Sequence, residues 1–130
     1  MRLTQKQFTA SVAAIVVNEK NEVLLLDHVL RPASGWGIPG GFLDRDEQPE
    51  AAVRRELREE TGIEISDIKL LSVRTANRHI EILFQAKSDA AVSVKSREIN
   101  AAGWFKVGAM PENMSRNQIL VIEKFLKDNL

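Results

Sequence analysis

Three glutamates within five consecutive residues have the types and spacing that point most directly to chemistry: Glu56, Glu59 and Glu60. In a helix each residue turns by about 100°, so these three fall within one arc of ~100°. Their charges repel, at a cost of roughly a few tenths of a kcal/mol for an exposed pair four positions apart. The arginines of this stretch are predicted to fan out on the other side: Arg54, Arg55 and Arg58. We therefore expect no compensating side-chain cation on the glutamate face, and a divalent metal ion would fill that role.

A solvated, charged helix is the alternative interpretation of this stretch. Glu50 precedes Arg54 by four positions, which is a favourable pair. Against this interpretation, the carboxylates adjoin an apolar stripe formed by Val53 and Leu57 instead of lying opposite it. The preceding turn, residues 39–41, contains two glycines and can bring carbonyl oxygens close to a bound ion. Spacing alone leaves both interpretations open.

The residue types also indicate which metal ion would bind. Carboxylates and a backbone carbonyl are hard oxygen ligands, so Mg²⁺ is expected and Mn²⁺ is the alternative. Zinc would favour histidine or cysteine, and the sequence has two histidines and no cysteine. The absence of cysteine excludes disulfides and thiol catalysis and fits a reducing compartment. We interpret His28 as a structural residue and not as a ligand.

The flanking sequence predicts how the glutamates are positioned. Asp46 is expected to cap the helix, Pro49 to lie in its first turn and Gly62 to end it. Alternation and turn residues predict the strands, and a final amphipathic helix is capped by Ser115 or Asn117. The strands Thr9–Val17 and Glu22–Asp27 are predicted to form a hairpin. Further strands are predicted at Ile38–Leu43, Lys69–Thr75 and Ile80–Lys87, followed by an apolar stretch at Ala101–Val107 and the final helix, which ends at Leu130.

Length and composition bound the classes of function. The 130 residues suit one domain, residues 1–130. Eighteen basic and eighteen acidic residues balance, so no global field attracts nucleic acid or an anionic membrane. The longest apolar run, Val12–Val17, is too short to span a bilayer, and no signal peptide is recognisable. We therefore expect a cytoplasmic protein with a small-molecule partner, no nucleic acid and no membrane.

The segment from Gly41 to Ile63 resembles the Nudix box, G-x5-E-x7-R-E-U-x-E-E-x-G-U, where U is a bulky aliphatic residue. All nine positions match: Gly41, Glu47, Arg55, Glu56, Leu57, Glu59, Glu60, Gly62 and Ile63. A nine-position match over 23 residues is a highly specific signal. The resemblance implies an α/β fold, an α/β/α Nudix sandwich with a mixed β-sheet. It also implies a metal-dependent pyrophosphohydrolase that cleaves a nucleoside diphosphate linked to a group X, with water attacking phosphorus.

The same resemblance assigns roles to individual residues. Glu59 and Glu60 match the principal metal ligands, and Glu56 matches a further ligand or the general base. The carbonyl of Gly40 is implied as another ligand, and Gly41 as a substrate contact. The remaining matches are Glu47 for an outer metal site, Arg55 as the arginine that orients box carboxylates, and Glu98, outside the box, as a late glutamate that binds metal or activates water.

The substrate is less well defined, because specificity lies outside the box. The compact length and Glu98 resemble MutT-like members that hydrolyse (d)NTPs, including oxidised ones, and this substrate class is preferred. The alternative is an ADP-ribose or NDP-sugar pyrophosphatase, and a catalytically silent nucleotide-binding module is the alternative from another class. Arg31 is a candidate for a substrate phosphate, and Trp36 is expected to pack against the sheet. The resemblance leaves a homodimer open.

Overall fold

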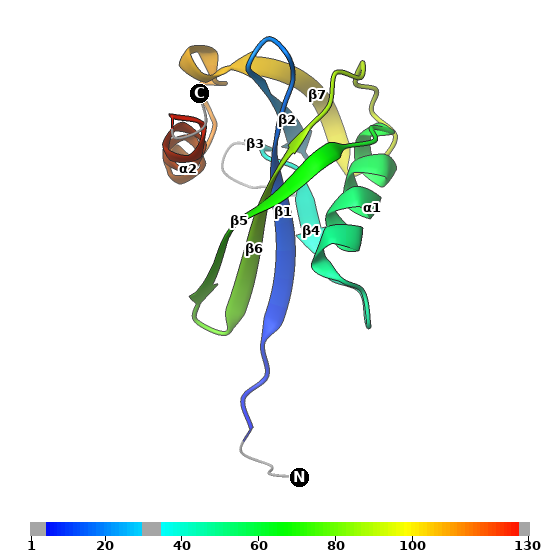
Figure 1. Ribbon diagram of the computed structural model, residues 1–130, viewed down its shortest axis with the longest axis vertical. Coiled ribbons are helices and arrows are strands. Elements are labelled where there is room, and N and C mark those ends of the chain that lie inside the picture. Colours follow the sequence, from blue (N-terminus) through cyan, green and yellow to red (C-terminus); the bar gives the residue numbers. More distant parts are fainter. Residues whose placement is uncertain (1–4, 30–34, 128–130) are drawn as a thin grey trace.

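The structure is a computed structural model that describes residues 5–29 and 35–127 (Figure 1). Its strands and helices follow one another in the order β1 Thr9–Val17, β2 Glu22–His28, β3 Trp36–Gly37, β4 Gly40–Phe42, α1 Pro49–Thr61, β5 Ser66–Ala76, β6 His79–Lys87, β7 Ile99–Lys106, the short 3-10 helix η1 Val107–Ala109, and α2 Arg116–Lys127. Among the described residues, no helix is long and apolar enough to cross a bilayer.

The strands form one mixed sheet built around β1. Its main order is β3-β2-β1-β6-β5, with β4 pairing to β1 and β7 pairing to β2. Strands β1 and β6 run parallel along their whole length, and the other pairs are antiparallel. The predicted hairpin of β1 and β2 is confirmed, but only Val17 and Val23 pair. The first half of β1 instead pairs with β4, which brings Gly40–Phe42 onto the central strand.

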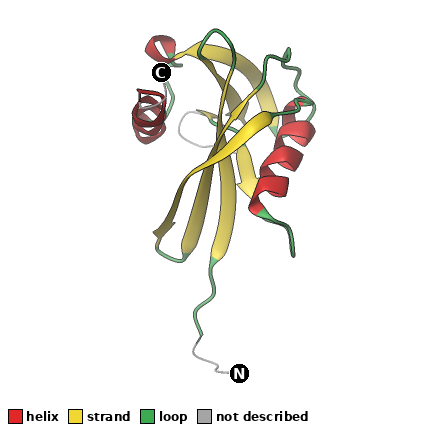
Figure 2. Cartoon of the chain, viewed as in Figure 1, coloured by secondary structure: helices red, strands yellow, loops and turns green. Residues whose placement is uncertain are grey.

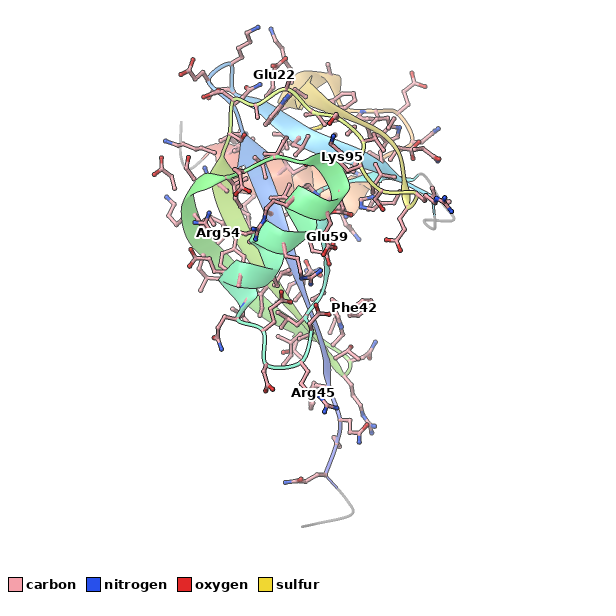
Figure 3. The ribbon with its side chains drawn as sticks, turned by 90° about the vertical axis from the view of Figure 1, so that its right-hand side faces the viewer. Glu22, Phe42, Arg45, Arg54, Glu59 and Lys95 are labelled. Atoms are coloured by element: carbon pink, nitrogen blue, oxygen red, sulfur yellow. The ribbon has the colours of Figure 1, made fainter. Side chains whose placement is uncertain are left out.

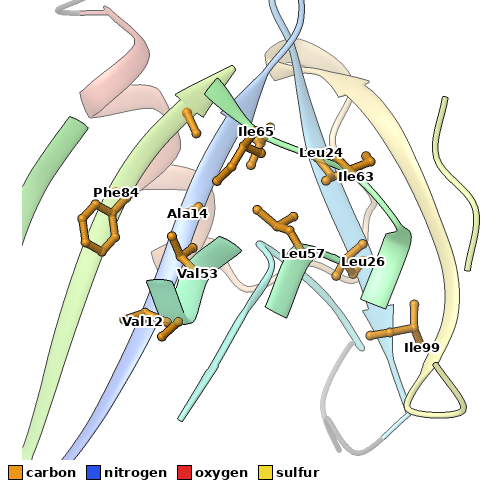
Figure 4. Close-up of a cluster of buried hydrophobic side chains, with 13 residues drawn as sticks. Val12, Ala14, Leu24, Leu26, Val53, Leu57, Ile63, Ile65, Phe84 and Ile99 are labelled. Atoms are coloured by element: carbon orange, nitrogen blue, oxygen red, sulfur yellow. The ribbon is translucent and has the colours of Figure 1, made fainter. Parts of the chain in front are cut away.

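Alternation along β1 and β2 divides the interior into two layers. Val12, Ala14 and Val16 pack on one face of the sheet, in a cluster that includes Val53 and Leu57 of α1 (Figure 4). Ile15 and its neighbours pack on the other face, in a cluster that includes buried residues of α2. Successive side chains of a strand point to opposite faces, so a strand apolar throughout can fill both layers. The two helices therefore lie on opposite faces of the sheet (Figure 2), and the predicted α/β/α sandwich is confirmed.

The ends of α1 follow the prediction in part. Pro49 occupies the first turn, where its missing N–H leaves no donor unsatisfied. Gly62 ends the helix in the left-handed conformation, φ 73°, and its N–H donates to the Arg58 carbonyl at 3.0 Å. The prediction that Asp46 caps the helix is wrong: Gln48 is the capping residue, without a side-chain hydrogen bond. Asp46 itself has φ 62° and belongs to the turn before the helix.

The predicted strand Ile38–Leu43 is confirmed only at Gly40–Phe42, which is β4, and a further short strand, β3, precedes it at Trp36–Gly37. The N–H of Ile38 donates to Oε1 of Gln118 in α2 at 3.0 Å, and Pro39 has no N–H to donate. Strand pairing therefore stops between β3 and β4. At the other end of the chain, α2 is described as far as Lys127, so the predicted end at Leu130 lies outside the described residues.

Candidate active site

Arg55 links a carboxylate before α1 to two carboxylates within the helix. Its Nε and Nη2 donate to the two carboxylate oxygens of Glu47 at 2.7 and 3.0 Å. Its Nη1 donates to Glu56 at 3.2 Å and to Glu59 at 3.3 Å. The prediction that no side-chain cation compensates the carboxylates is therefore wrong, and so is the placement of Arg55 on the other side of the helix. Arg54 does lie on the opposite flank of α1 from Glu59 (Figure 3).

The pair of Glu47 and Arg55 is the tightest contact in this network. Two parallel N–H···O bonds between a guanidinium and a carboxylate are strong and fix the relative orientation of both groups. The hydrogen bond from Arg55 lowers the pKa of Glu47 from its ordinary 4.5 to about 2. The N–H of Asp44 also donates to Glu47, at 3.0 Å, which ties the carboxylate to the turn before the helix. Glu47 is thus ionised at neutral pH and holds Arg55 in one orientation.

The carboxylate of Glu56 lies against the backbone of β4. A Cβ at Gly41 would overlap both oxygens of this carboxylate, so position 41 has to be glycine for Glu56 to lie there. Burial raises the pKa of Glu56 above its ordinary value, with Arg55 opposing the shift and the charges of Glu59 and Glu98 adding to it. Glu98, just before β7, is therefore close enough to act on Glu56 electrostatically, although 42 positions separate them in the sequence.

Glu60 faces the interior of the protein. Only 5% of the residue is exposed, and its Oε2 lies 3.7 Å from Nε2 of His28 at the end of β2. Glu59, in contrast, has 59% of its side chain exposed. His28 thus contacts a predicted metal ligand, a role that the sequence did not suggest because the two residues lie 32 positions apart.

The donor atoms of this site have the chemistry that a divalent ion requires. Glu56 supplies carboxylate oxygens beside the glycine backbone of β4, and Glu59 supplies a carboxylate oxygen bonded to the same Nη1 of Arg55. Hard cations such as Mg²⁺ prefer oxygen ligands. In residues 5–29 and 35–127, no three acidic or histidine side chains are gathered into a ready ligand set. Glu59 is exposed, and solvent weakens its ion pair with Arg55. Its side chain can therefore turn away from Arg55. The residues present therefore fit a divalent ion, with Glu59 reoriented.

A cavity of about 650 Å³ opens on the other face of β4. Phe42 is paired with Ser11, so the two side chains share one face, whereas Gly41 is paired with Val12 of the α1 layer. The cavity is lined by residues of strands β1, β4, β5 and β6, of the segment between β3 and β4, and of helix α2. The residues of β4 among them are Gly40, Gly41 and Phe42. Because position 41 has no side chain, the Glu56 carboxylate lies directly against the backbone of β4, and Gly41 also lines the cavity.

The sequence model of the NUDIX domain matches residues 7–125. This chain belongs to the NUDIX family. A MutT-like protein of Streptomyces ambofaciens is 34% identical over 110 residues, which are 82% of this chain and 70% of that protein. The 8-oxo-dGDP phosphatase NUDT18 of Mus musculus is 29% identical over 115 residues, 84% of this chain and 36% of that protein. The chain thus spans little more than a third of the length of the mouse relative.

Solved NUDIX structures have the same fold. The NUDIX domain of Shewanella oneidensis NrtR, complexed with ADP ribose, superimposes with a TM-score of 0.79 at 25% identity. The superposition covers 97% of this chain and 90% of that one. The family resemblance predicted from the box is therefore confirmed, and the chain is a NUDIX hydrolase that acts on phosphoric anhydrides.

Two further site predictions concern Arg31 and Trp36. Arg31, the candidate for a substrate phosphate, lies outside the described residues. Trp36 packs edge-on against Phe105 with 5.1 Å between ring centroids, as predicted. Sequence reasoning missed the cavity wall on α2, and in particular Gln118. No local signal distinguishes Gln118, because its partner Ile38 lies 80 positions away.

Proposed function

We propose that this chain hydrolyses nucleoside triphosphates, with deoxynucleotides and their oxidised forms preferred. The observation that carries the proposal is that the glycine backbone of β4 lines the cavity and also contacts the Glu56 carboxylate at Gly41. A nucleoside in the cavity would extend its phosphates past the edge of β4 toward Glu56. A cavity of about 650 Å³ lies within the usual range for ligands of this size, roughly 300–1,000 Å³. The name of the mouse relative, an 8-oxo-dGDP phosphatase, supports the choice of oxidised purine nucleotides.

In this proposal the residues of α1 and β4 have distinct tasks. Glu56, Glu59 and Glu60 would hold Mg²⁺, with Mn²⁺ as the alternative ion and the Gly40 carbonyl as a further ligand. When bound, the ion would neutralise phosphate charge and make water more acidic. Glu56 or Glu98 would accept the proton of the attacking water, and the raised pKa of Glu56 suits a base.

Arg55 positions the carboxylates in this arrangement. Its bidentate pair with Glu47 leaves Nη1 to hold Oε1 of Glu56 and Oε2 of Glu59. Arg55 therefore reaches the reaction through carboxylates and not by contact with substrate. Gly41 would allow both the approach of Glu56 and the passage of phosphates across β4.

ADP-ribose is the second candidate substrate, together with NDP-sugars. It is favoured by the similarity to the NrtR domain, whose structure contains ADP ribose. ADP-ribose has the same pyrophosphate and would place its second ribose outside the cavity. A domain that binds nucleotides without turnover is the remaining alternative, and the complete set of box carboxylates argues against it.

Product release from a substrate panel tests the proposal. The panel contains dGTP, dGDP, 8-oxo-dGTP, dATP, ADP-ribose and one NDP-sugar. Each substrate is incubated once with about a fivefold excess of Mg²⁺ and once with EDTA. We expect the oxidised or normal deoxynucleotides to give the highest kcat/KM and EDTA to abolish turnover. Preferential hydrolysis of ADP-ribose would select the second candidate. Binding of nucleotide by calorimetry without any product would select the silent module.

A further inference from the structure

Glu98 is held in a different way from the carboxylates that Arg55 contacts. Those are bonded through their side chains, whereas the hydrogen bonds that the described residues make to Glu98 are to its backbone. Its N–H donates to Oγ of Ser96 at 3.1 Å, and its carbonyl accepts the N–H of Val29 at 2.8 Å. Because Glu98 is exposed, these two backbone bonds decide where its side chain starts and in which direction it points.

The bond between Glu98 and Ser96 belongs to a turn formed by residues 96–99. The carbonyl of Ser96 accepts the N–H of Ile99 at 3.2 Å, while the hydroxyl of Ser96 accepts the N–H of Glu98. A serine hydroxyl that accepts an N–H two residues further on stabilises a turn of this kind. Ile99 is buried in the layer of α1, which anchors the end of the turn. The turn therefore presents Glu98 in one orientation at the start of β7.

The residue before this turn is attached to the helix that carries the box carboxylates. The N–H of Lys95 donates to the carbonyl of Glu60 at 2.9 Å, and Lys95 lies at the C-terminal end of α1 (Figure 3). A Cβ at Gly62 would come within 3.2 Å of Cε of Lys95, so this side chain packs against the glycine that ends the helix. The segment thus connects the end of α1 directly to Glu98, whose charge acts on Glu56.

We propose that Ser96 is a positioning residue for the hydrolysis, because its hydroxyl holds Glu98 where the glutamate accepts a proton from the attacking water. In that step the water oxygen bonds to phosphorus, the bond from phosphorus to the bridging oxygen breaks, and one water proton goes to the Glu98 carboxylate. The inference rests on the proposed function, since it requires Glu98 to take part in the reaction. Ser96 contacts neither substrate nor water in this role and acts only through Glu98.

The size of the effect follows from the single hydrogen bond that Ser96 contributes. A neutral hydrogen bond of this kind changes an equilibrium by about fivefold, so without it Glu98 is in place for a smaller fraction of the time. We therefore expect Ser96→Ala to lower kcat by about fivefold, and by no more than Glu98→Gln does. KM should change little, because the substrate contacts remain.

A double-mutant cycle tests whether Ser96 acts through Glu98. The values of kcat and KM are measured with Mg²⁺ and the best substrate of the panel for the wild type, Ser96→Ala, Glu98→Gln and the double variant. Ser96→Ala should lower kcat in the wild type and have no further effect in Glu98→Gln, because the residue that it positions is then already inactive. Ser96→Thr, which keeps the hydroxyl, should have the kcat of the wild type.

Ser88→Ala is the matched control. Oγ of Ser88 accepts the N–H of Ala90 at 3.2 Å, again two residues further on, at the other end of the connection between β6 and β7. Loss of this bond should leave kcat unchanged. Amide hydrogen exchange of the metal-free proteins gives a readout that does not depend on turnover. The Glu98 N–H should exchange about fivefold faster in Ser96→Ala than in the wild type, Ser96→Thr or Ser88→Ala.

The outcomes separate the inference from the proposed function. Turnover of no substrate of the panel by the wild type would reject the proposed function and this inference with it. Full activity of Glu98→Gln would reject only the inference, because Glu56 remains as the base. The inference would also be overturned by an unchanged kcat in Ser96→Ala, by an equal loss in both backgrounds, or by a Ser96→Thr protein as slow as Ser96→Ala.

Discussion

The carboxylate of Glu56 occupies the volume that a side chain at Gly41 would need. The glycine of β4 and the glutamate of α1 are thus one structural unit, although each also matches a separate position of the Nudix box. Their contact brings the helix carboxylates next to the strand that borders the cavity.

Gly41→Ala should therefore displace Glu56 and lower kcat. A shift of about 1 Å in a catalytic group costs about a hundredfold in rate, and we expect a loss of that order. Steady-state kinetics with the best substrate of the panel measures it. Gly108→Ala is the control, because a Cβ at Gly108 would meet nothing within 4 Å and should leave kcat unchanged. Equal rates in Gly41→Ala and the wild type would show that the Glu56 position is not required.

Glu59→Gln should lower turnover by roughly a thousandfold, because a metal ligand would be lost and with it several kcal/mol of transition-state stabilisation. Glu50→Gln is a closely matched control. Both glutamates belong to α1, pair with an arginine four positions away and have similarly exposed side chains, 59% and 58%. Normal turnover in a folded Glu59→Gln protein would remove Glu59 from the active site.

Arg55→Lys should lower kcat by about tenfold or more, because one ammonium group cannot reproduce the bidentate pair with Glu47 and also hold Glu56. KM should change less, since Arg55 acts through the carboxylates. Arg58→Lys changes an exposed arginine of the same helix and should have little effect. A rise in KM with kcat unchanged would instead indicate direct substrate contact by Arg55.

Glu47 should make stability depend on pH. Its folded pKa, about 2, lies below the ordinary 4.5, so its contribution is present above pH 4.5 and is lost as the pH falls toward 2. Urea unfolding of the metal-free wild type and of Glu47→Gln measures the difference between them. We expect the wild type to be more stable near neutral pH and the two curves to converge as the pH approaches 2. A constant difference over this range would contradict the lowered pKa.

Local signals were sufficient for much of the fold. The apolar strands β1 and β2, the proline at the start of α1 and the glycine at its end were all predicted, because each depends on neighbouring residues. The Asp46 cap was wrong for a local reason as well: the turn from Asp44 to Glu47 occupies the residues before Gln48. The residue that begins the helix, two positions after Asp46, cannot be located without the geometry of that turn.

The sequence alone therefore determined the family, the reaction class and the residue types of the site, because the box is contiguous and its chemistry follows from nine positions. Tertiary structure decided the rest. Three contacts depend on how strands and helices pack: the hydrogen bond from Arg55 to Glu47, the electrostatic interaction of Glu98 with Glu56, and the hydrogen bond from Ile38 to Gln118. Helical periodicity places a side chain on a face, but only packing determines which partner that face meets.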